Sequence, residues 1–168
     1  MMGQTHANLP LVEAIERDIV PIFLRGPHET ATKAVSIVVE ANSTLVHQRF
    51  IECIWKRGGG LLFTPKILRE GDEWGQGLVR DPGGFGMIEV VTRVDKGRIL
   101  EYCIPQGLPI STHWGIVNFE QLEENVTKIT WVMHYTPTIP GRLGFGLFCE
   151  YLLYPYFLHN LKKDLGKN

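Results

Sequence analysis

Tyr102, His134 and Arg80 are the side chains whose types could carry acid–base or anion-binding chemistry. A tyrosine hydroxyl can orient a ligand carbonyl or act as a general acid, and a histidine can act as a general base near neutral pH. An arginine can hold a carboxylate through two parallel hydrogen bonds. Each has a structural alternative: a tyrosine bonded to the backbone, an outward-facing histidine, or an ion pair of Arg80 with Asp81 or Glu89 at the surface, which we slightly prefer for Arg80. These alternatives stay open, and the sequence assigns no catalytic residue.

His113 lies on a segment expected to neighbour that of His134, and the same two interpretations apply to it. Paired with a glutamate across the sheet, either histidine could be a general base. The more common arrangement is an outward-facing histidine in contact with water. We expect this second arrangement for both.

Other kinds of site are not indicated. A metal site needs three or four converging ligands, and the sequence contains neither an HExxH motif nor a CxxC pair. No phosphate-binding glycine loop is present either, so we expect no metal and no cofactor. The cysteines, Cys53, Cys103 and Cys149, are far apart and odd in number, which favours free thiols in a reducing compartment. With no secretory signal pattern in the first ten residues, we expect a cytoplasmic protein.

The bulk composition is that of one globular domain. The chain has 168 residues, is 44% hydrophobic and carries a net charge of −1, so nucleic-acid binding is disfavoured. Its most apolar stretch, 143–161, includes Glu150 and Pro155. At 100° per residue its apolar side chains form one stripe, typical of a helix packed on a sheet rather than spanning a membrane. The stripe consists of Leu143, Leu147, Tyr151, Tyr154, Leu158, Leu161 and Leu165.

The first element that could position a site is a helix at 11–24, which Pro21 kinks or ends. Its apolar residues share one face: Leu11, Val12, Ile15, Ile19, Ile22 and Phe23. A linker follows at 25–30, where glycine and proline punctuate the chain. We therefore divide the chain into an N-terminal extension, 1–31, and one domain, 32–168.

The domain begins with a β-branched strand at 32–41 and a helix at 44–55, capped by Asn42 or Ser43. A long helix at 141–164 ends it. Between these helices, short runs joined by turn residues predict antiparallel strands. The expected strands are 66–70, 77–80, 86–94, 98–105, 112–122 and 126–136.

Several segments resemble the START-like superfamily (SRPBCC), which includes polyketide cyclases and dehydratases, lipid-transfer domains and pollen allergens. The similar stretches lie within 32–165 and include "GQGLVR", "YCIPQGLP", "TKITW" and "LLYPYFLHNLKKDL". The resemblance implies an α+β helix-grip fold, in which a curved antiparallel sheet wraps around a long C-terminal helix. Here an extra N-terminal helix precedes it. The resemblance also implies a hydrophobic cavity between that helix and the sheet.

Strand alternation and the helix stripe predict which residues line such a cavity, although a one-residue shift in strand phase exchanges inside and outside. The predicted lining is Ile88, Val90, Tyr102, Ile104, Asn118, Trp131, Met133, Leu147 and Tyr151. We expect the cavity to bind a small hydrophobic or lipid-like ligand, for transport or sensing. The alternative is an enzyme similar to polyketide cyclases or dehydratases that uses the tyrosine, histidine and arginine named at the outset. The N-terminal helix is a candidate contact for a homodimer.

Overall fold

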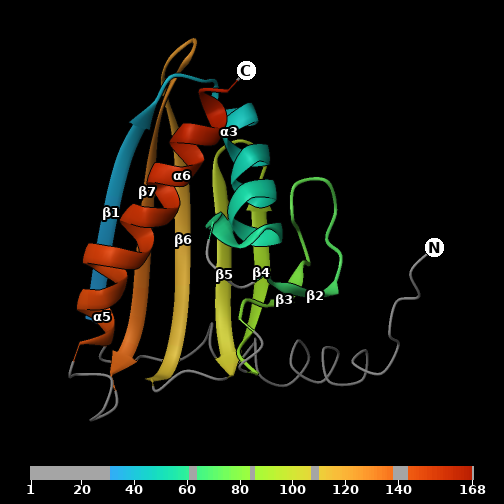
Figure 1. Ribbon diagram of the computed structural model, residues 1–168, viewed down its shortest axis with the longest axis vertical. Coiled ribbons are helices and arrows are strands. Elements are labelled where there is room, and N and C mark those ends of the chain that lie inside the picture. Colours follow the sequence, from blue (N-terminus) through green and yellow to red (C-terminus); the bar gives the residue numbers. More distant parts are fainter. Residues whose placement is uncertain (1–30, 61–63, 84–85, 107–109, 138–143, 168) are drawn as a thin grey trace.

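The computed structural model describes residues 31–60, 64–83, 86–106, 110–137 and 144–167. Seven antiparallel strands form one sheet in the order β1-β7-β6-β5-β4-β3-β2, and the helices cover one of its faces (Figure 1). The expected helix at 11–24 lies outside the described residues. The strands are β1 (Ala31–Val39), β2 (Lys66–Arg69), β3 (Val79–Asp81), β4 (Ile88–Asp95), β5 (Ile99–Gln106), β6 (Ile110–Glu123) and β7 (Val126–Pro137).

Two helical stretches pack on the sheet. The first consists of α3 (Ser43–Phe50), a π-helical turn η3 (Ile51–Lys56) and the short η4 (Gly58–Gly60). Asn42 caps it, because its side chain accepts a hydrogen bond of 2.9 Å from the backbone N–H of Leu45. The second stretch crosses the sheet near β1 and β7 and consists of α5 (Phe145–Phe148), a π-helical turn η5 (Cys149–Leu153) and α6 (Tyr154–Leu165) (Figure 1).

The π-helical turn η5 changes which side chains of the closing helix reach the core. Pro155 has no N–H to donate to the carbonyl four residues earlier, and the Tyr154 N–H bonds instead to the carbonyl of Cys149, five residues earlier. The wider turn rotates the preceding residues relative to a regular helix. Cys149 is therefore buried, whereas Leu147 and Tyr151 are 55% and 68% exposed. The expected burial of these two residues was wrong.

The strand phase of β4 also differs from expectation. Ile88 and Val90 lie in a small cluster with Val79 and Cys103, separate from the main core. Val91, which is opposite Tyr102 on β5, belongs to the main core instead. Glu89, between Ile88 and Val90, marked the other phase of β4 as polar, but its carboxylate is buried in an ion pair with Arg80, and the register of β4 with β5 shifts on either side of Val90 and Val91. Alternation alone therefore gave the wrong inner face. The predicted inward direction of Ile88 and Val90 was wrong.

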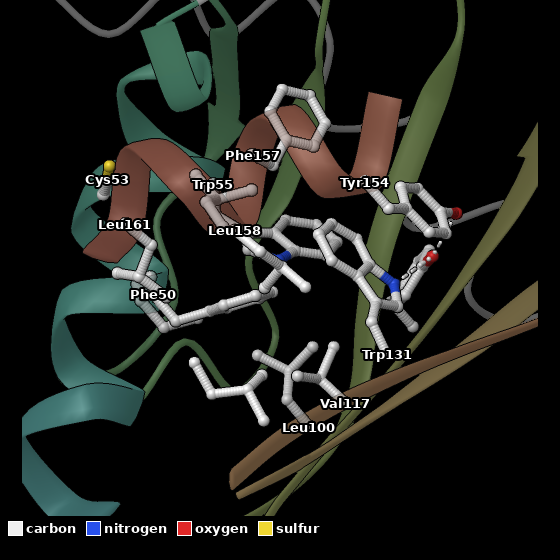
Figure 2. Packing of buried hydrophobic residues seen from close by; sticks show 14 of the residues in the cluster. Phe50, Cys53, Trp55, Leu100, Val117, Trp131, Tyr154, Phe157, Leu158 and Leu161 are labelled. Atoms are coloured by element: carbon white, nitrogen blue, oxygen red, sulfur yellow. Dashed lines mark hydrogen bonds between the residues drawn. The ribbon is translucent and has the colours of Figure 1, made fainter. Parts of the chain in front are cut away.

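The main core lies between the helices and the inner face of the sheet, and it is rich in aromatic side chains (Figure 2). Phe50 from α3 meets Trp131 of β7 edge to face, with ring centroids 5.2 Å apart. Trp131 stacks on Tyr154 of α6 at 4.1 Å. These contacts join both helices to the central strands and fix the position of the polar groups among them. In the described part of the chain, no helix is long and apolar enough to cross a bilayer.

Candidate functional site

The hydroxyl group of Tyr102 is the centre of a buried polar cluster, which we call the Tyr102 node: Tyr102, His113, Trp131 and Tyr154. Trp131 donates its indole N–H to Tyr102 Oη at 2.9 Å, and Tyr154 Oη lies 3.0 Å from the same oxygen (Figure 2). His113 Nε2 lies 3.4 Å from it. All four residues are at least 90% buried. Neighbouring strands and the closing helix thus bring donors and acceptors to one oxygen atom inside an apolar core.

Strand alternation and one glycine explain how the node forms. Tyr102 lies opposite Gly115 in the pairing of β5 with β6. The missing side chain leaves room for the tyrosine ring to lie across β6. His113, two residues before Gly115, projects from the same face of β6, because successive side chains alternate. Trp131 reaches the node from β7, where it stacks on the ring of Tyr154.

Burial keeps the titratable groups of the node neutral near pH 7. It raises the pKa of Tyr102 above its ordinary value, against a smaller opposing effect of the hydrogen bond from Tyr154. It also raises the pKa of Tyr154. Burial, helped by repulsion from His134, lowers the pKa of His113 to about 3. The node therefore offers neutral hydrogen-bonding groups rather than charges.

Arg80 and Glu89 form a second buried polar pair. Arg80 Nε donates to a carboxylate oxygen of Glu89 at 2.5 Å, and the two residues are 4% and 8% exposed. The same guanidinium donates to the carbonyls of Ile54 and Trp55, both at 2.6 Å. Pairing with Glu89 agrees with one sequence interpretation of Arg80, but its expected surface position was wrong. The pair joins β3 and β4 to the end of η3.

Trp55 lies between the node and the arginine pair. Its ring carries the Arg80 guanidinium at 4.2 Å on one face, and it meets the Tyr102 ring edge to face at 5.4 Å. The indole nitrogen is fully buried and has no hydrogen-bond partner among the residues that the structure describes. An unused buried donor is costly unless some acceptor reaches it. Trp55 is therefore a candidate contact for a polar atom of a ligand.

The structure brings only some of the sequence-predicted lining together. Tyr102, Ile104, Trp131 and Met133 are buried in the main core. Asn118 is flanked by two core residues of β6, so its side chain projects to the opposite face of the sheet. The four other predicted residues, Ile88, Val90, Leu147 and Tyr151, lie outside the main core as described above.

His134 is separated from the node by the thickness of the sheet. It stacks on Trp114 at 3.9 Å, and its Nδ1 lies 3.0 Å from the hydroxyl of Thr32. The histidine next to Tyr102 is therefore His113 and not His134. That histidine, His113, was expected to face outward and is 1% exposed. Its spacing of two, four and six residues from Gly115, Val117 and Phe119 was the available signal for an inward side chain.

A hollow of about 380 Å³ lies on the surface beside η4 and α6, away from the node. Asn160 and Tyr156 donate to the carbonyls of Gly59 and Gly60 there, at 2.7 Å each. Arg57 pairs with Asp164 at 3.2 Å. These bonds hold η4 against α6, and the hollow lies apart from the Tyr102 node. No set of three potential metal ligands converges within the described ranges.

No protein-family model matches the sequence, and no curated protein matches it either. Similar solved structures do exist. Norcoclaurine synthase from Thalictrum flavum has a TM-score of 0.62 at 12% identity, and the match covers 100% of this chain and 97% of that one. A protein from Thermobifida fusca has a TM-score of 0.59 at 16% identity, with coverage of 81% and 93%. Ara h 8.0201 has a TM-score of 0.59 at 10% identity, with coverage of 83% and 99%.

These identities are too low to transfer a function, and they concern the fold alone. The seven-stranded antiparallel sheet and the closing helix agree with the expected architecture. Taken with these neighbours, they show that the chain has the helix-grip fold.

Proposed function

We propose that the protein binds a small hydrophobic molecule carrying one hydrogen-bonding oxygen, between the closing helix and the sheet. The unused indole N–H of Trp55, buried beside the Tyr102 node, is the observation that carries this proposal. The surrounding side chains are apolar and aromatic, so most of the ligand's surface would leave water at a gain of about 25 cal/mol per Å². The polar groups would then fix its orientation.

The neighbouring polar groups suit an uncharged ligand oxygen. A carbonyl or hydroxyl oxygen could accept from Trp55, and Tyr102 and His113 could rearrange their neutral hydrogen bonds around it. A carboxylate is less suitable, because Arg80 is already bound to Glu89 and to two backbone carbonyls. Another norcoclaurine synthase structure, of a point mutant, is described as a complex with a transition-state analogue. This gives one small-molecule complex of a protein with a similar fold.

The alternative, an acid–base enzyme similar to polyketide cyclases or dehydratases, draws on the contact of Tyr102 with His113. Norcoclaurine synthase is by its name an enzyme, which favours this alternative. The electrostatics favour binding instead. A general acid or base works best with a pKa near the working pH, whereas burial moves the pKa of His113 down to about 3 and that of Tyr102 upward. Both groups are poorly suited to exchange protons near pH 7.

Native mass spectrometry of freshly purified protein is the first experiment. A co-purifying apolar molecule that carries oxygen supports the proposal. The second experiment follows the quenching of tryptophan fluorescence by 2-naphthol and by naphthalene, which differ in one hydroxyl group. We expect Trp55→Phe to weaken 2-naphthol about tenfold, or about 1.4 kcal/mol, and to affect naphthalene much less.

His134→Gln, on the other face of the sheet, is the matched control and should change neither affinity. Saturable binding of neither probe, together with no co-purifying molecule, would overturn the proposal. Turnover of a bound ketone that His113→Phe abolishes would favour the enzyme.

The cysteines bear on the cellular location that we propose. Cys53, Cys103 and Cys149 are all buried thiols outside any disulfide. Burial raises the pKa of Cys149 to about 12, which leaves its thiol protonated and unreactive. Free thiols support our inference of a reducing compartment such as the cytoplasm.

A further inference from the structure

An exposed apolar surface follows the first half of the closing helix. It consists of Leu147, Phe148, Tyr151, Leu152 and Tyr156, which we call the α5–η5 face; all five are at least 43% exposed. Elsewhere in the described chain, the exposed large apolar side chains are the single residues Val38 and Leu122. A hollow of about 280 Å³ lies within the face, and the described residues that line it are Phe148, Leu152, Leu153 and Tyr156. Concentrated apolar exposure of this kind marks an interaction surface.

The N-terminal part of the chain enters the domain beside this face. β1 begins at Ala31, and two residues later Lys33 Nζ makes an ion pair of 2.8 Å with Glu150, on η5 itself. Figure 1 shows the start of β1 next to α5. The ten residues 21–30 can reach at most about 35 Å from Ala31, which is more than the length of the face. Residues that precede Pro21 can therefore reach every part of it.

The sequence of those residues fits the face. Leu11, Ile15 and Ile19 are spaced by four, which places them in one ridge of a helix. Phe148, Leu152 and Tyr156 repeat the same spacing on the closing helix. Although the π-helical turn η5 lies between Phe148 and Tyr156, the three side chains line one hollow and so form one continuous row. Rows of this kind interdigitate in the commonest helix packing of globular proteins. The two ridges also have similar lengths, because each extends over nine residues, or about 12 Å between its first and last residue in a regular helix.

We propose that residues 11–20 form a helix that packs along the α5–η5 face of the same chain. The closing helix starts next to Ala31 and leads away from it, whereas residues 11–20 lead toward it. The two helices are therefore antiparallel, and Ile15 lies near Leu152. One side chain of this ridge enters the apolar hollow. The acidic residues Glu13 and Glu16 then lie on the outer side, in contact with water.

Disulfide cross-linking in the full chain tests this arrangement. The variant Ile15→Cys with Leu152→Cys places thiols on the two facing ridges, and the three native cysteines are buried. We expect an internal cross-link that forms about tenfold faster than in the control, because docking raises the effective concentration of the two thiols. The control is Arg17→Cys with Leu152→Cys, because Arg17 lies on the opposite side of the expected helix.

A second measurement needs no cross-link. In the variant Ile15→Asp with Ile19→Asp, we expect amide hydrogen exchange of residues 147–153 to rise several-fold, because their cover is lost. Glu13→Gln with Glu16→Gln should leave exchange unchanged.

Equal cross-linking in both cysteine pairs, or unchanged exchange in the aspartate variant, would overturn the proposal. Cross-links between chains, with a dimer mass in solution, would assign the face to a second copy instead. Sedimentation of the native chain with phosphatidylcholine vesicles would show a face open to lipid and would also contradict it.

Discussion

The ring of Tyr102 occupies the space that a side chain on Gly115 would need. A Cβ at Gly115 would come within 2.4 Å of the tyrosine Cε1 and 2.5 Å of its hydroxyl oxygen. The tyrosine cannot easily yield, because its hydroxyl is bonded within the buried node. The glycine therefore serves the packing of its neighbour on the next strand.

We predict that Gly115→Ala lowers the free energy of unfolding by about 1–3 kcal/mol, the usual cost of overpacking a core. Urea denaturation followed by tryptophan fluorescence measures it. Gly166→Ala is a suitable control, because an added Cβ there would meet its nearest neighbour at 3.6 Å. An unchanged urea midpoint in Gly115→Ala would mean that the ring moves aside freely.

Tyr102→Phe removes the oxygen that accepts from Trp131 and leaves a buried indole N–H without a partner. We predict a loss of about 1–3 kcal/mol in the free energy of unfolding, the cost of an unsatisfied buried donor. Tyr154→Phe is the matched control, because it removes a hydroxyl from the same node but keeps the bond between Trp131 and Tyr102. It should cost less. If both variants lose the same free energy of unfolding, the bond from Trp131 to Tyr102 contributes no more to stability than the bond between Tyr102 and Tyr154.

The order of the elements could be predicted because its signals are local. Alternation over 126–136 predicted a strand that the structure places at Val126–Pro137. The Asn42 cap was recognisable because its side chain bonds to a backbone N–H only three residues away. Turn residues between short apolar runs were enough to indicate antiparallel neighbours.

The predicted orientation of side chains failed where two physical effects competed with alternation. Glu89, between Ile88 and Val90, suggested a polar outer phase, but it is buried in its ion pair with Arg80, whereas Val91 belongs to the main core. Leu147 and Tyr151 belong to a regular helical stripe only if every turn has 3.6 residues. Pro155, in the next turn, explains the π-helical turn, but its effect on the face depends on the fold around it.

The sequence predicted that Tyr102 points inward, but it could not predict the hydrogen-bond partners of its hydroxyl group. Tyr154 is 52 residues away in the sequence and meets it only when the closing helix packs on the sheet. The pair of Arg80 with Glu89 shows the same limit. The sequence suggested the partner, but its burial depends on η3, whose last carbonyls accept from the guanidinium.

Arg80→Met leaves the Glu89 carboxylate buried without its cation. We predict a loss of about 3–5 kcal/mol in the free energy of unfolding, typical of a broken buried ion pair. Arg80→Met with Glu89→Leu removes both charges and should be more stable than Arg80→Met alone, because no buried charge remains unpaired. Both are measured by urea denaturation. The single variant Glu89→Leu completes the comparison. If the loss of stability in the double variant equals the sum of the losses in the two single variants, the two side chains are not coupled.

Because His47 and His113 are buried, we predict that the free energy of unfolding decreases in mild acid. Burial lowers the pKa of His113 to about 3, and it also lowers the pKa of His47. His47 Nδ1 accepts a hydrogen bond from the Gly97 N–H at 3.1 Å, and protonation of that nitrogen would break it. Below pH 6.5 the unfolded chain takes up protons on these residues while the folded chain does not. The contribution of His113 is therefore complete above pH 6.5 and is lost as the pH falls toward 3, and that of His47 is lost in the same direction.

We expect the free energy of unfolding to decrease by up to about 1.4 kcal/mol per pH unit for each of these histidines. The range between pH 6.5 and about 5 is the informative one, because most carboxylates titrate below it. Urea denaturation at a series of pH values measures the slope. His113→Phe keeps a buried ring without a titratable nitrogen, so its slope should be smaller by the contribution of one histidine. His134→Gln should change the slope less, since that side chain is only partly buried. An identical slope in the native chain and in His113→Phe would mean that His113 takes up its proton without unfolding, and that the node is open to water.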